Sequence, residues 1–535
     1  DAGLVRGAQG EVLGGTLPAL AAWLCAEDRG AHTTPVRAFF WCFRAYADPV
    51  ALADTLLGVY RGAGDDWRVQ ARVVHHVFAW LKHYWLAADD SAALGALGDW
   101  VAGPHDARVQ PAVDALLALV RWRARLGDQV QRVELQVACA DGVATVQRVV
   151  CTAQGERLEL GLSGNEGDAA ALATCTDARR LCAAPVPGAP APPVPAVSKG
   201  VRAALRAAPD LWSVSVLDLD AAELARQITI AEARLFASVL PMELLYCHEP
   251  YCRPNGTTAT ATATHARAMA TFTTQLTNWM GECLLRETDV KRRTLVLQHL
   301  VRVGSESLAL CNFNLLMAVQ GALNSSTVLR LKRTWAGLST KTLARFEAQR
   351  AVMEHTRNFA AYRAQLRDAQ GPVLPFLGLV NTDVTFCLSG HAKRRAAPEG
   401  APDGTPEVVN WVRCMRLAEI VGEVQRFQAR AYTLVEVPEL QRFLAQMRDE
   451  VQVASCAQSY AAATEQLYQR SLELEPRDDG GAALPRQRSR SLVAAALPWN
   501  SLGARRSASE RRTSADDTAS LDSKRSRWER VRRRR

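Results

Sequence analysis

Residues 69–85, Val69-Gln-Ala-Arg-Val-Val-His-His-Val-Phe-Ala-Trp-Leu-Lys-His-Tyr-Trp85, carry apolar side chains at every third or fourth position. This spacing is typical of an amphipathic helix, because residues three and four apart share one helical face. The apolar face is made of Val69, Val73, Val77, Trp80, Leu81 and Tyr84. The surrounding residues 11–101 are predicted to be helical as well, with Asp48-Pro49 as a turn that starts a new helix.

Helical patterning returns from Leu217 to Pro476. Two apolar helix faces mark it, formed by Leu297, Leu300, Val301 and Leu308, and by Leu417, Ile420, Val421, Val424 and Phe427. The predicted fold class is therefore mainly α-helical. A small β-hairpin is predicted near residues 133–150, where alternating apolar residues flank Asp141-Gly142. Six prolines within residues 183–197 predict a stiff, extended linker.

The composition fits a globular protein of several domains. Of the 535 residues, 48% are apolar and 22% charged, and no apolar run approaches the roughly 18 residues that span a bilayer. The 13 cysteines include no CxxC pair, which argues against a zinc site and a disulfide framework. Because residue 1 is Asp, we expect the chain to be a fragment of a longer protein.

The net charge of +9 is concentrated in the C-terminal tail. Residues 478–535 hold 15 basic and 7 acidic side chains, which leaves +1 on residues 1–477. The nearly neutral body argues against nucleic-acid binding. The final Arg532, Arg533, Arg534 and Arg535 could meet an anionic membrane surface, act as a nuclear-import signal, or form part of a solvated disordered tail.

The common signatures of bond chemistry are absent. The sequence has no GxxxxGK[ST], HExxH or GxSxG, and no catalytic spacing of His and carboxylate residues. We therefore expect no metal, no cofactor and no small-molecule substrate. These patterns alone describe a large helical protein with a basic tail, and a helical adaptor stays open as one interpretation.

A series of ordered segments adds a resemblance to the catalytic domain of Ras-family guanine-nucleotide exchange factors. The segments are Glu223–Thr229, Pro241–Leu245, Leu310–Met317, Leu323–Trp335, Arg357–Phe359, Pro372–Gly378, Thr382–Phe386, Arg416–Ile420, Val437–Leu440 and Ser471–Pro476. Upstream, Gly14–Leu17, Phe39–Tyr46 and Val77–Trp85 resemble the helical Ras exchanger motif that accompanies this domain. The resemblance implies two helical domains, the exchanger motif at 5–125 and the catalytic domain at 211–477. The residues between them, 126–210, form an insert and proline-rich linker that match neither domain, and the Arg/Ser-rich composition of residues 478–535 predicts a disordered basic tail.

The resemblance implies catalysis of nucleotide exchange on a small GTPase, without bond chemistry. A helical hairpin from about Asn381 to Phe427 would displace switch I of the GTPase. Its wedge residues would be Thr382, Thr385, Phe386 and Ser389. Ser389 stands before Gly390, where many family members have an acidic residue, and Lys393–Arg395 is expected to lie in a solvated loop.

A second implied site is the pocket that grips switch II. Met317, Phe359 and Phe376 match its positions, although the same residues could be ordinary core. Thr274, Asn324, Leu329 and Phe427 match further GTPase contacts.

The implied partner is Ras itself or a Rap-like polarity GTPase. An exchange-inactive GTPase-binding scaffold is the alternative. The implied location is the cytoplasm, with recruitment to the inner face of the plasma membrane.

Overall fold

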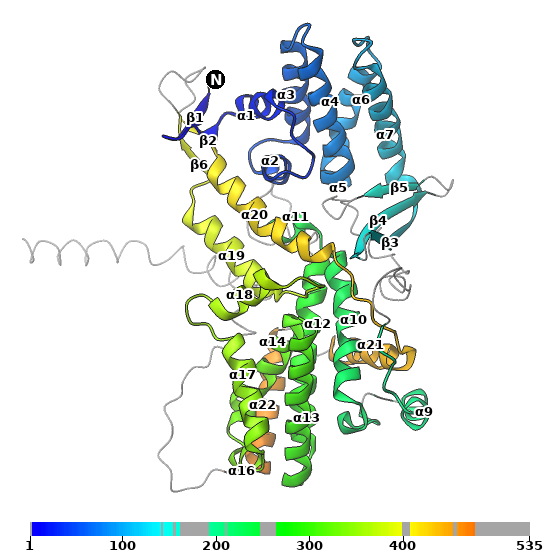
Figure 1. Ribbon diagram of the computed structural model, residues 1–535, viewed down its shortest axis with the longest axis vertical. Coiled ribbons are helices and arrows are strands. Elements are labelled where there is room, and N and C mark those ends of the chain that lie inside the picture. Colours follow the sequence, from blue (N-terminus) through cyan, green and yellow to red (C-terminus); the bar gives the residue numbers. More distant parts are fainter. Residues whose placement is uncertain are drawn as a thin grey trace, which may run out of the picture.

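The computed structural model describes residues 3–140, 143–152, 157–160, 192–208, 210, 212–246, 264–397, 407–452 and 457–476. Helices dominate these residues, which confirms the predicted fold class (Figure 1). None of the described helices is long and apolar enough to cross a bilayer. The same residues contain no cluster of His, Cys, Asp or Glu side chains suited to a metal ion. The tail that contains Arg532 to Arg535 and most of the proline-rich segment 183–197 lie outside the described ranges.

The N-terminal residues form two short strands followed by a group of helices at one end of the molecule (Figure 1). The elements are β1 (Leu4–Arg6), β2 (Val12–Gly15), α1 (Leu17–Ala26), α2 (Thr34–Cys42), η1 (Phe43–Ala45), α3 (Pro49–Gly62), α4 (Trp67–Ala79), η2 (Trp80–Tyr84), α5 (Ala87–Asp90), η3 (Ser91–Ala93), α6 (Leu94–Val101) and α7 (Gln110–Gln129). The helical prediction is confirmed for most of residues 11–101, but it is wrong for the strand Val12–Gly15.

Local sequence signals set where these helices begin. The Asp48 carboxylate accepts a hydrogen bond from the backbone N–H of Ala51 at 2.8 Å, and Pro49 is the first residue of α3. This cap satisfies one of the backbone donors that a helix start leaves unpaired. The predicted turn and helix start at Asp48-Pro49 are thus confirmed.

A buried ion pair fixes the N-terminal helices to one another. The guanidinium of Arg44 contacts the carboxylate of Asp90, and their side chains are 4% and 0% exposed. Asp90 also accepts from the indole N–H of Trp80 at 3.1 Å and from the backbone N–H of Leu86 at 2.9 Å. The buried carboxylate is therefore paired and hydrogen-bonded, as a charge away from water must be.

The predicted β-hairpin is confirmed. Strands β3 (Val130–Ala140) and β4 (Val143–Thr152) pair antiparallel with Ala140 opposite Val143. A third strand that the sequence pattern did not predict, β5 (Arg157–Leu160), pairs with β4.

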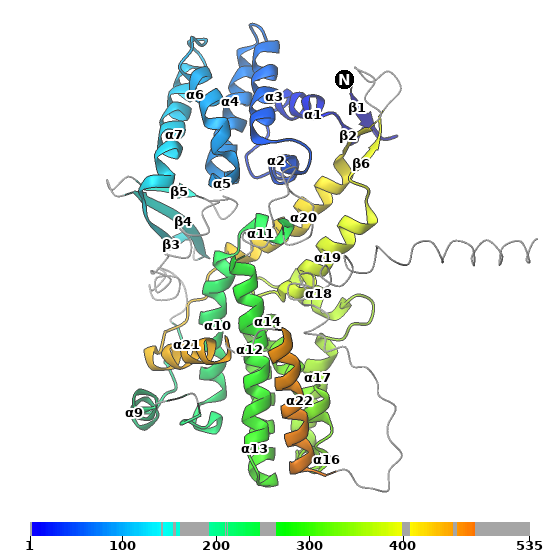
Figure 2. The ribbon, with the colours of Figure 1, turned by 180° about the vertical axis from the view of Figure 1, so that it is seen from behind.

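The C-terminal half forms a second helical assembly. Its elements are α9 (Lys199–Ala207), η5 (Val216–Asp218), α10 (Ala221–Ser238), α11 (Pro241–Tyr246), α12 (Thr264–Arg286), α13 (Val290–Ala309), α14 (Phe313–Leu323), α15 (Ser326–Leu329), α16 (Lys332–Ala336), α17 (Thr340–Val352), α18 (Ala360–Asp368), α19 (Leu377–Gly390), β6 (Arg394–Ala396), β7 (Glu407–Asn410), α20 (Trp411–Gln428), α21 (Pro438–Gln452) and α22 (Ala457–Leu474). Helices α12, α13 and α14 lie against one another, as both views of the ribbon show (Figures 1 and 2). Their buried side chains belong to one hydrophobic core.

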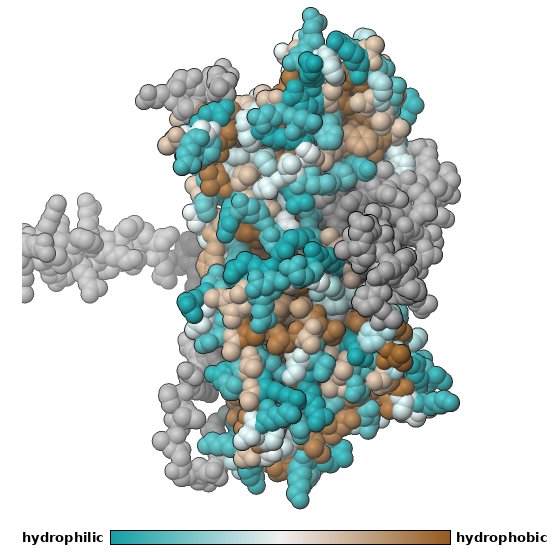
Figure 3. Space-filling model, viewed as in Figure 1, coloured by the Kyte–Doolittle hydropathy of each residue, from teal (hydrophilic) through white to brown (hydrophobic). Residues whose placement is uncertain are grey.

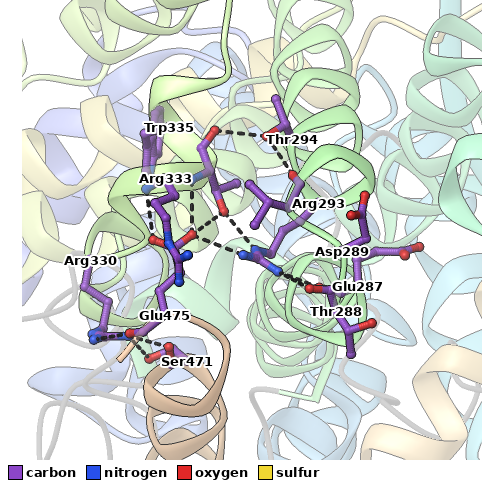
Figure 4. Close-up of polar contacts among 12 residues, drawn as sticks. Glu287, Thr288, Asp289, Arg293, Thr294, Arg330, Arg333, Trp335, Ser471 and Glu475 are labelled. Atoms are coloured by element: carbon purple, nitrogen blue, oxygen red, sulfur yellow. Dashed lines mark hydrogen bonds and ion pairs between the residues drawn. The ribbon is translucent and has the colours of Figure 1, made fainter. Parts of the chain in front are cut away.

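Glu475, just after α22, joins that helix to the assembly (Figure 4). Its carboxylate accepts from the Arg293 guanidinium at 3.1 Å and from the Thr334 hydroxyl at 2.7 Å. The Arg333 backbone N–H donates to its second oxygen at 2.9 Å. Burial opposes ionisation, but these bonds outweigh it and hold the pKa of Glu475 below its usual value.

The hairpin is joined to the N-terminus by a four-stranded sheet in the order β1-β2-β7-β6. Helices α19 and α20 rise to this sheet, which lies at the upper left of Figure 1. Gly14 and Gly15 of β2 pair with Asn410 and Val409 of β7. The expectation of a loop at Lys393–Arg395 is therefore wrong, because Arg394–Ala396 forms strand β6 beside β7, although Lys393 and Arg394 are exposed to solvent as expected.

Candidate functional site

The predicted wedge residues share one face of α19. Thr382, Thr385, Phe386 and Ser389 recur at three- and four-residue intervals, and Phe386 is 66% exposed. The three hydroxyls donate to carbonyls one turn earlier: Thr382 to Gly378 at 2.9 Å, Thr385 to Asn381 at 2.8 Å and Ser389 to Thr385 at 2.9 Å. The face thus combines one exposed aromatic ring with neutral hydroxyl groups.

The charge on α19 does not come from position 389. The acidic residue of this helix is Asp383, and its carboxylate receives two hydrogen bonds of 2.8 Å from the Arg363 guanidinium. Ser389 is neutral, so it cannot repel a phosphate or attract a cation as a carboxylate would. The predicted wedge face is therefore uncharged, and the acidic group of α19 is already paired with Arg363 of α18.

A left-handed turn precedes α18. Arg357, Asn358 and Phe359 have φ angles of 48°, 56° and 58°. Three such residues in succession are unusual, because the side chain of an L-residue clashes with its own backbone there. Arg363 supports the turn by donating to the Asn358 carbonyl at 2.9 Å, while its other nitrogens bind Asp383. Arg363 thereby joins the turn to α19, a link that sequence reasoning missed.

The predicted switch II residues are placed in one hydrophobic core. Met317 and Phe376 are 1% and 3% exposed, whereas Phe359 is half-buried against the same core. The Phe376 backbone N–H donates to the Tyr362 hydroxyl at 3.0 Å, and the Tyr362 ring lies edge to face with Phe313, 5.1 Å between centroids. Of the three residues, only Phe359 reaches the surface. The burial of the other two fits ordinary core residues as well as the floor of a switch II pocket, so both interpretations stay predictions.

The four further predicted contacts differ in exposure. Leu329 is 49% exposed at the end of α15, and Thr274 and Asn324 are half-buried. Phe427 on α20 is 8% exposed, beneath the Arg426 guanidinium at 4.6 Å. Helix α12, which carries Thr274, packs along α14 and touches α19. On the face drawn in Figure 3, apolar residues gather in a band where α12 and α10 pass below the hairpin.

The tip of the hairpin, where α19 ends and α20 begins, is held by contacts within the hairpin and from the N-terminal helices. The Arg413 guanidinium on α20 donates to the His391 carbonyl at the end of α19, at 3.0 Å. From the N-terminal helices, the Tyr46 hydroxyl donates to the Lys393 carbonyl at 3.1 Å and lies 3.7 Å from the Cys414 sulfur. Residues this far apart carry no sequence signal of their contact. The arrangement can present a rigid helical projection to a partner protein.

Comparison with known proteins supplies the family. Residues 223–415 match the RasGEF domain. The chain is 30% identical over 269 residues to cell division control protein 25 of Candida albicans, covering 50% of this chain and 19% of that protein. It is 27% identical over 265 residues to Ras guanine nucleotide exchange factor A of Dictyostelium discoideum, covering 50% and 42%.

A third relative, Ras guanine nucleotide exchange factor efc25 of Schizosaccharomyces pombe, is 31% identical over 206 residues, covering 38% of this chain and 19% of that protein. The aligned segments thus span between 19% and 42% of these relatives. The N-terminal helices lie outside the family match, so their assignment as a Ras exchanger motif stays a prediction. Residues 223–415 of this chain are a RasGEF domain.

Proposed function

We propose that this protein is a guanine-nucleotide exchange factor for a Ras-family small GTPase. The observation that carries the proposal is the exposed Phe386 on α19, within the RasGEF domain and on a hairpin whose tip pairs with β2. The hairpin would insert beside the nucleotide site, displace switch I and release GDP. GTP then enters because it is the more abundant nucleotide in the cell.

The free energy for opening the GTPase comes from differential binding. An exchange factor must bind the nucleotide-free GTPase more tightly than the loaded form, since equal affinity shifts nothing. Moving such an equilibrium from 1:99 to 99:1 needs about 5.5 kcal/mol. A protein interface with a few buried aromatic anchors supplies a preference of this size without a cofactor.

The N-terminal helices would act as a support that keeps the hairpin in its active position, the role of a Ras exchanger motif. The support for this role is the pairing of β2 with β7 and the packing of α2 along α20. A hairpin free to bend would spend part of the binding free energy on its own ordering.

The test is release of a fluorescent GDP analogue from purified Ras-, Rap-, Ral- and Rho-type GTPases, in excess unlabelled nucleotide. We expect residues 1–480 to accelerate release from a Ras or a Rap-like GTPase. The panel separates these two candidate substrates. If no GTPase responds and none binds, the proposal is wrong.

An exchange-inactive scaffold is the second candidate, and Ser389 favours it. A hydroxyl at this position cannot mimic a phosphate near the magnesium ion, so the hairpin would bind without expelling the nucleotide efficiently. Binding to a nucleotide-free GTPase without accelerated release would identify this case.

We further propose that the protein works in the cytoplasm and meets the inner face of the plasma membrane through its basic tail. Each basic residue close to anionic lipid contributes about 1 kcal/mol. Deleting residues 485–535 is expected to reduce binding to phosphatidylserine vesicles and to leave exchange in solution unchanged. Equal vesicle binding by both forms would contradict the membrane role.

A further inference from the structure

Glu232 on α10 is a completely buried carboxyl group whose hydrogen-bond partners are all neutral. Its side chain is 0% exposed. One oxygen accepts from the side-chain amide of Asn312 at 2.7 Å, and the other accepts from the side-chain amide of Asn314 at 2.7 Å. A buried acid without a cation is costly, so a plain structural role would be filled better by an uncharged side chain.

The direction of every hydrogen bond around Glu232 is fixed. The Thr229 hydroxyl donates to the Ala225 carbonyl and the Thr273 hydroxyl to the Met269 carbonyl, so each hydroxyl oxygen can only accept from an amide. The Asn312 amide donates to Thr229 at 2.9 Å, and the Asn314 amide donates to Thr273 at 2.8 Å.

All four amide hydrogens of the two asparagines are therefore committed. The Asn312 carbonyl oxygen accepts from the Leu315 backbone N–H at 2.9 Å, which fixes the orientation of that amide. Both oxygens of Glu232 accept from amide donors, so the ionised form satisfies every bond, whereas the O–H of the protonated form would have no acceptor among these groups.

This network fixes the turn Cys311–Asn314. The backbone of that turn bonds to Leu374, which lies just before α19 at the base of the hairpin. Asn312 caps α14, and Cys311 before it has a φ of 52°. The Phe313 backbone N–H donates to the Leu374 carbonyl at 2.9 Å, and the Leu374 N–H donates to the Cys311 carbonyl at 3.1 Å. Leu374 lies two residues before Phe376, the residue that immediately precedes α19.

The protonated form of Glu232 is also populated near neutrality. Burial raises its pKa to about 7, although the bonds from Asn312 and Asn314 work in the opposite direction. The facing groups that titrate are the Tyr432 phenol and the Cys311 thiol, and burial raises the pKa of both, so they stay neutral.

Within the described part of the chain, the other elements packed on α10 present no free charge to this carboxyl. Helices α12 and α14 face it with Thr273 and Asn314, and α13 contributes the Ser307 carbonyl to the Asn312 backbone. Toward α21, Arg234 is paired with Glu436 at 2.6 Å.

We propose that Glu232 is a positioning residue for nucleotide exchange: its ionised form holds the Cys311–Asn314 turn, and protonation loosens the base of the hairpin and slows exchange. The inference rests on the proposed exchange activity and adds a dependence on pH. The group whose protonation would change the exchange rate lies in the core, away from the surface proposed to touch the GTPase.

A merely structural role would have the opposite pH dependence. Since the folded state binds the proton of Glu232 more tightly than the unfolded chain does, the free energy of unfolding decreases as pH rises from about 4.5 to about 7. Exchange should instead increase over the upper part of that range. The two trends separate positioning from stability in a single protein.

The test compares the full chain with the variants Glu232→Gln and Glu232→Gln/Asn314→Asp, and with Glu347→Gln as a control. Glu347 is a surface glutamate, 60% exposed. Exchange is followed between pH 6 and 8, with the spontaneous release from the GTPase subtracted and folding checked by circular dichroism. The ionised fraction of a group half-ionised near pH 7 increases about tenfold from pH 6 to pH 8, so we expect the rate to rise several-fold in the parent and the control.

Glu232→Gln should be slow at every pH, because its amide nitrogen faces another donor. In the double variant, the carboxylate introduced at position 314 can accept from the amide introduced at position 232, and the rate at pH 8 should recover. A parent rate that is flat between pH 6 and 8, or a folded Glu232→Gln variant with the parent profile, overturns the inference. The parent profile decides the question even if the variants do not fold.

Hydrogen exchange of the isolated protein separates this inference from the proposed function. Peptides that contain Phe313 and Leu374 should lose protection below pH 7, after correction for the intrinsic rate. If that loss occurs but no GTPase responds at any pH, the positioning device stands and the exchange proposal fails. If protection does not change with pH, the inference is wrong whatever the activity.

Discussion

Trp23 on α1 and Trp411, the first residue of α20, meet edge to face with ring centroids 5.9 Å apart and planes at 80°. They are separated by 388 positions in the sequence, yet Trp411 belongs to a hydrophobic core and Trp23 packs against the same core. Aromatic pairs of this geometry contribute about 0.5–1.5 kcal/mol beyond their buried area. The hairpin and the N-terminal helices are therefore packed against each other through a shared core.

Replacing Gly14 by valine tests whether the contact between the N-terminal strands and the hairpin supports exchange. A Cβ atom at Gly14 would lie 2.8 Å from the Val409 carbonyl and 2.6 Å from the Arg395 side chain. The sheet must open, at a cost of about 1–3 kcal/mol. We expect slower GDP release, measured by fluorescence, from a protein that stays folded. Gly58→Ala, where nothing lies within 4 Å, is the control and should match the parent.

Removing the ring of Phe386 tests the wedge. The side chain is 66% exposed, so Phe386→Ala should leave the melting temperature unchanged. If the ring is an interface anchor, its loss costs about 2 kcal/mol or more, which is roughly a 30-fold loss in kcat/KM for exchange. Leu295→Ala, an equally simple truncation of a 51% exposed side chain on α13, should exchange normally. Normal exchange by Phe386→Ala would remove this residue from the site.

A carboxylate at position 389 tests the electrostatic part of the mechanism. Ser389 is exposed and bonds only to its own helix, so Ser389→Glu should fold normally. The added negative charge would disfavour the phosphate-bound GTPase, and we expect faster GDP release. Ser389→Gln has a similar size without charge and should resemble the parent. Equal rates for the two variants would show that charge at this position has no effect.

The lowered pKa of Glu475 predicts that the packing of α22 is destabilised by acid. Its pKa is lower in the folded protein than in the unfolded chain, so its stabilising effect is complete above its unfolded pKa of 4.5 and is lost as pH falls further. Glu475→Gln leaves the Arg293 guanidinium, which is 0% exposed, without a counter-charge. We expect a loss of about 3–5 kcal/mol in urea unfolding at pH 7.

The matched control for Glu475 is Glu419→Gln, because the Arg416–Glu419 pair is 61% and 50% exposed. Exposed pairs contribute only about 0–1 kcal/mol. The stability difference between the Glu475 variant and the parent should also shrink at low pH. A constant difference between pH 7 and pH 3 would contradict the role of ionised Glu475.

The predictable features were those that depend on near neighbours in the chain. The apolar spacing of Val69–Trp85 and the Asp48-Pro49 cap predicted helices, since a helix is held by bonds four residues apart. The turn at Asp141-Gly142 predicted the strands on either side of it. The ordered family segments predicted which helix carries Phe386.

The sequence by itself thus determined the mainly helical class, the family of residues 223–415 and the residues of the α19 face. Only the tertiary structure decided that Val12–Gly15 pairs with β7 and that Lys393–Arg395 leads into a strand. The pattern of a four-residue strand is too short to be recognised, and one of the two strands that pair with β2 lies almost 400 positions away. The burial of Glu232 was decided in the same way, because only packing of α10 against α12 and α14 removes that carboxyl group from water.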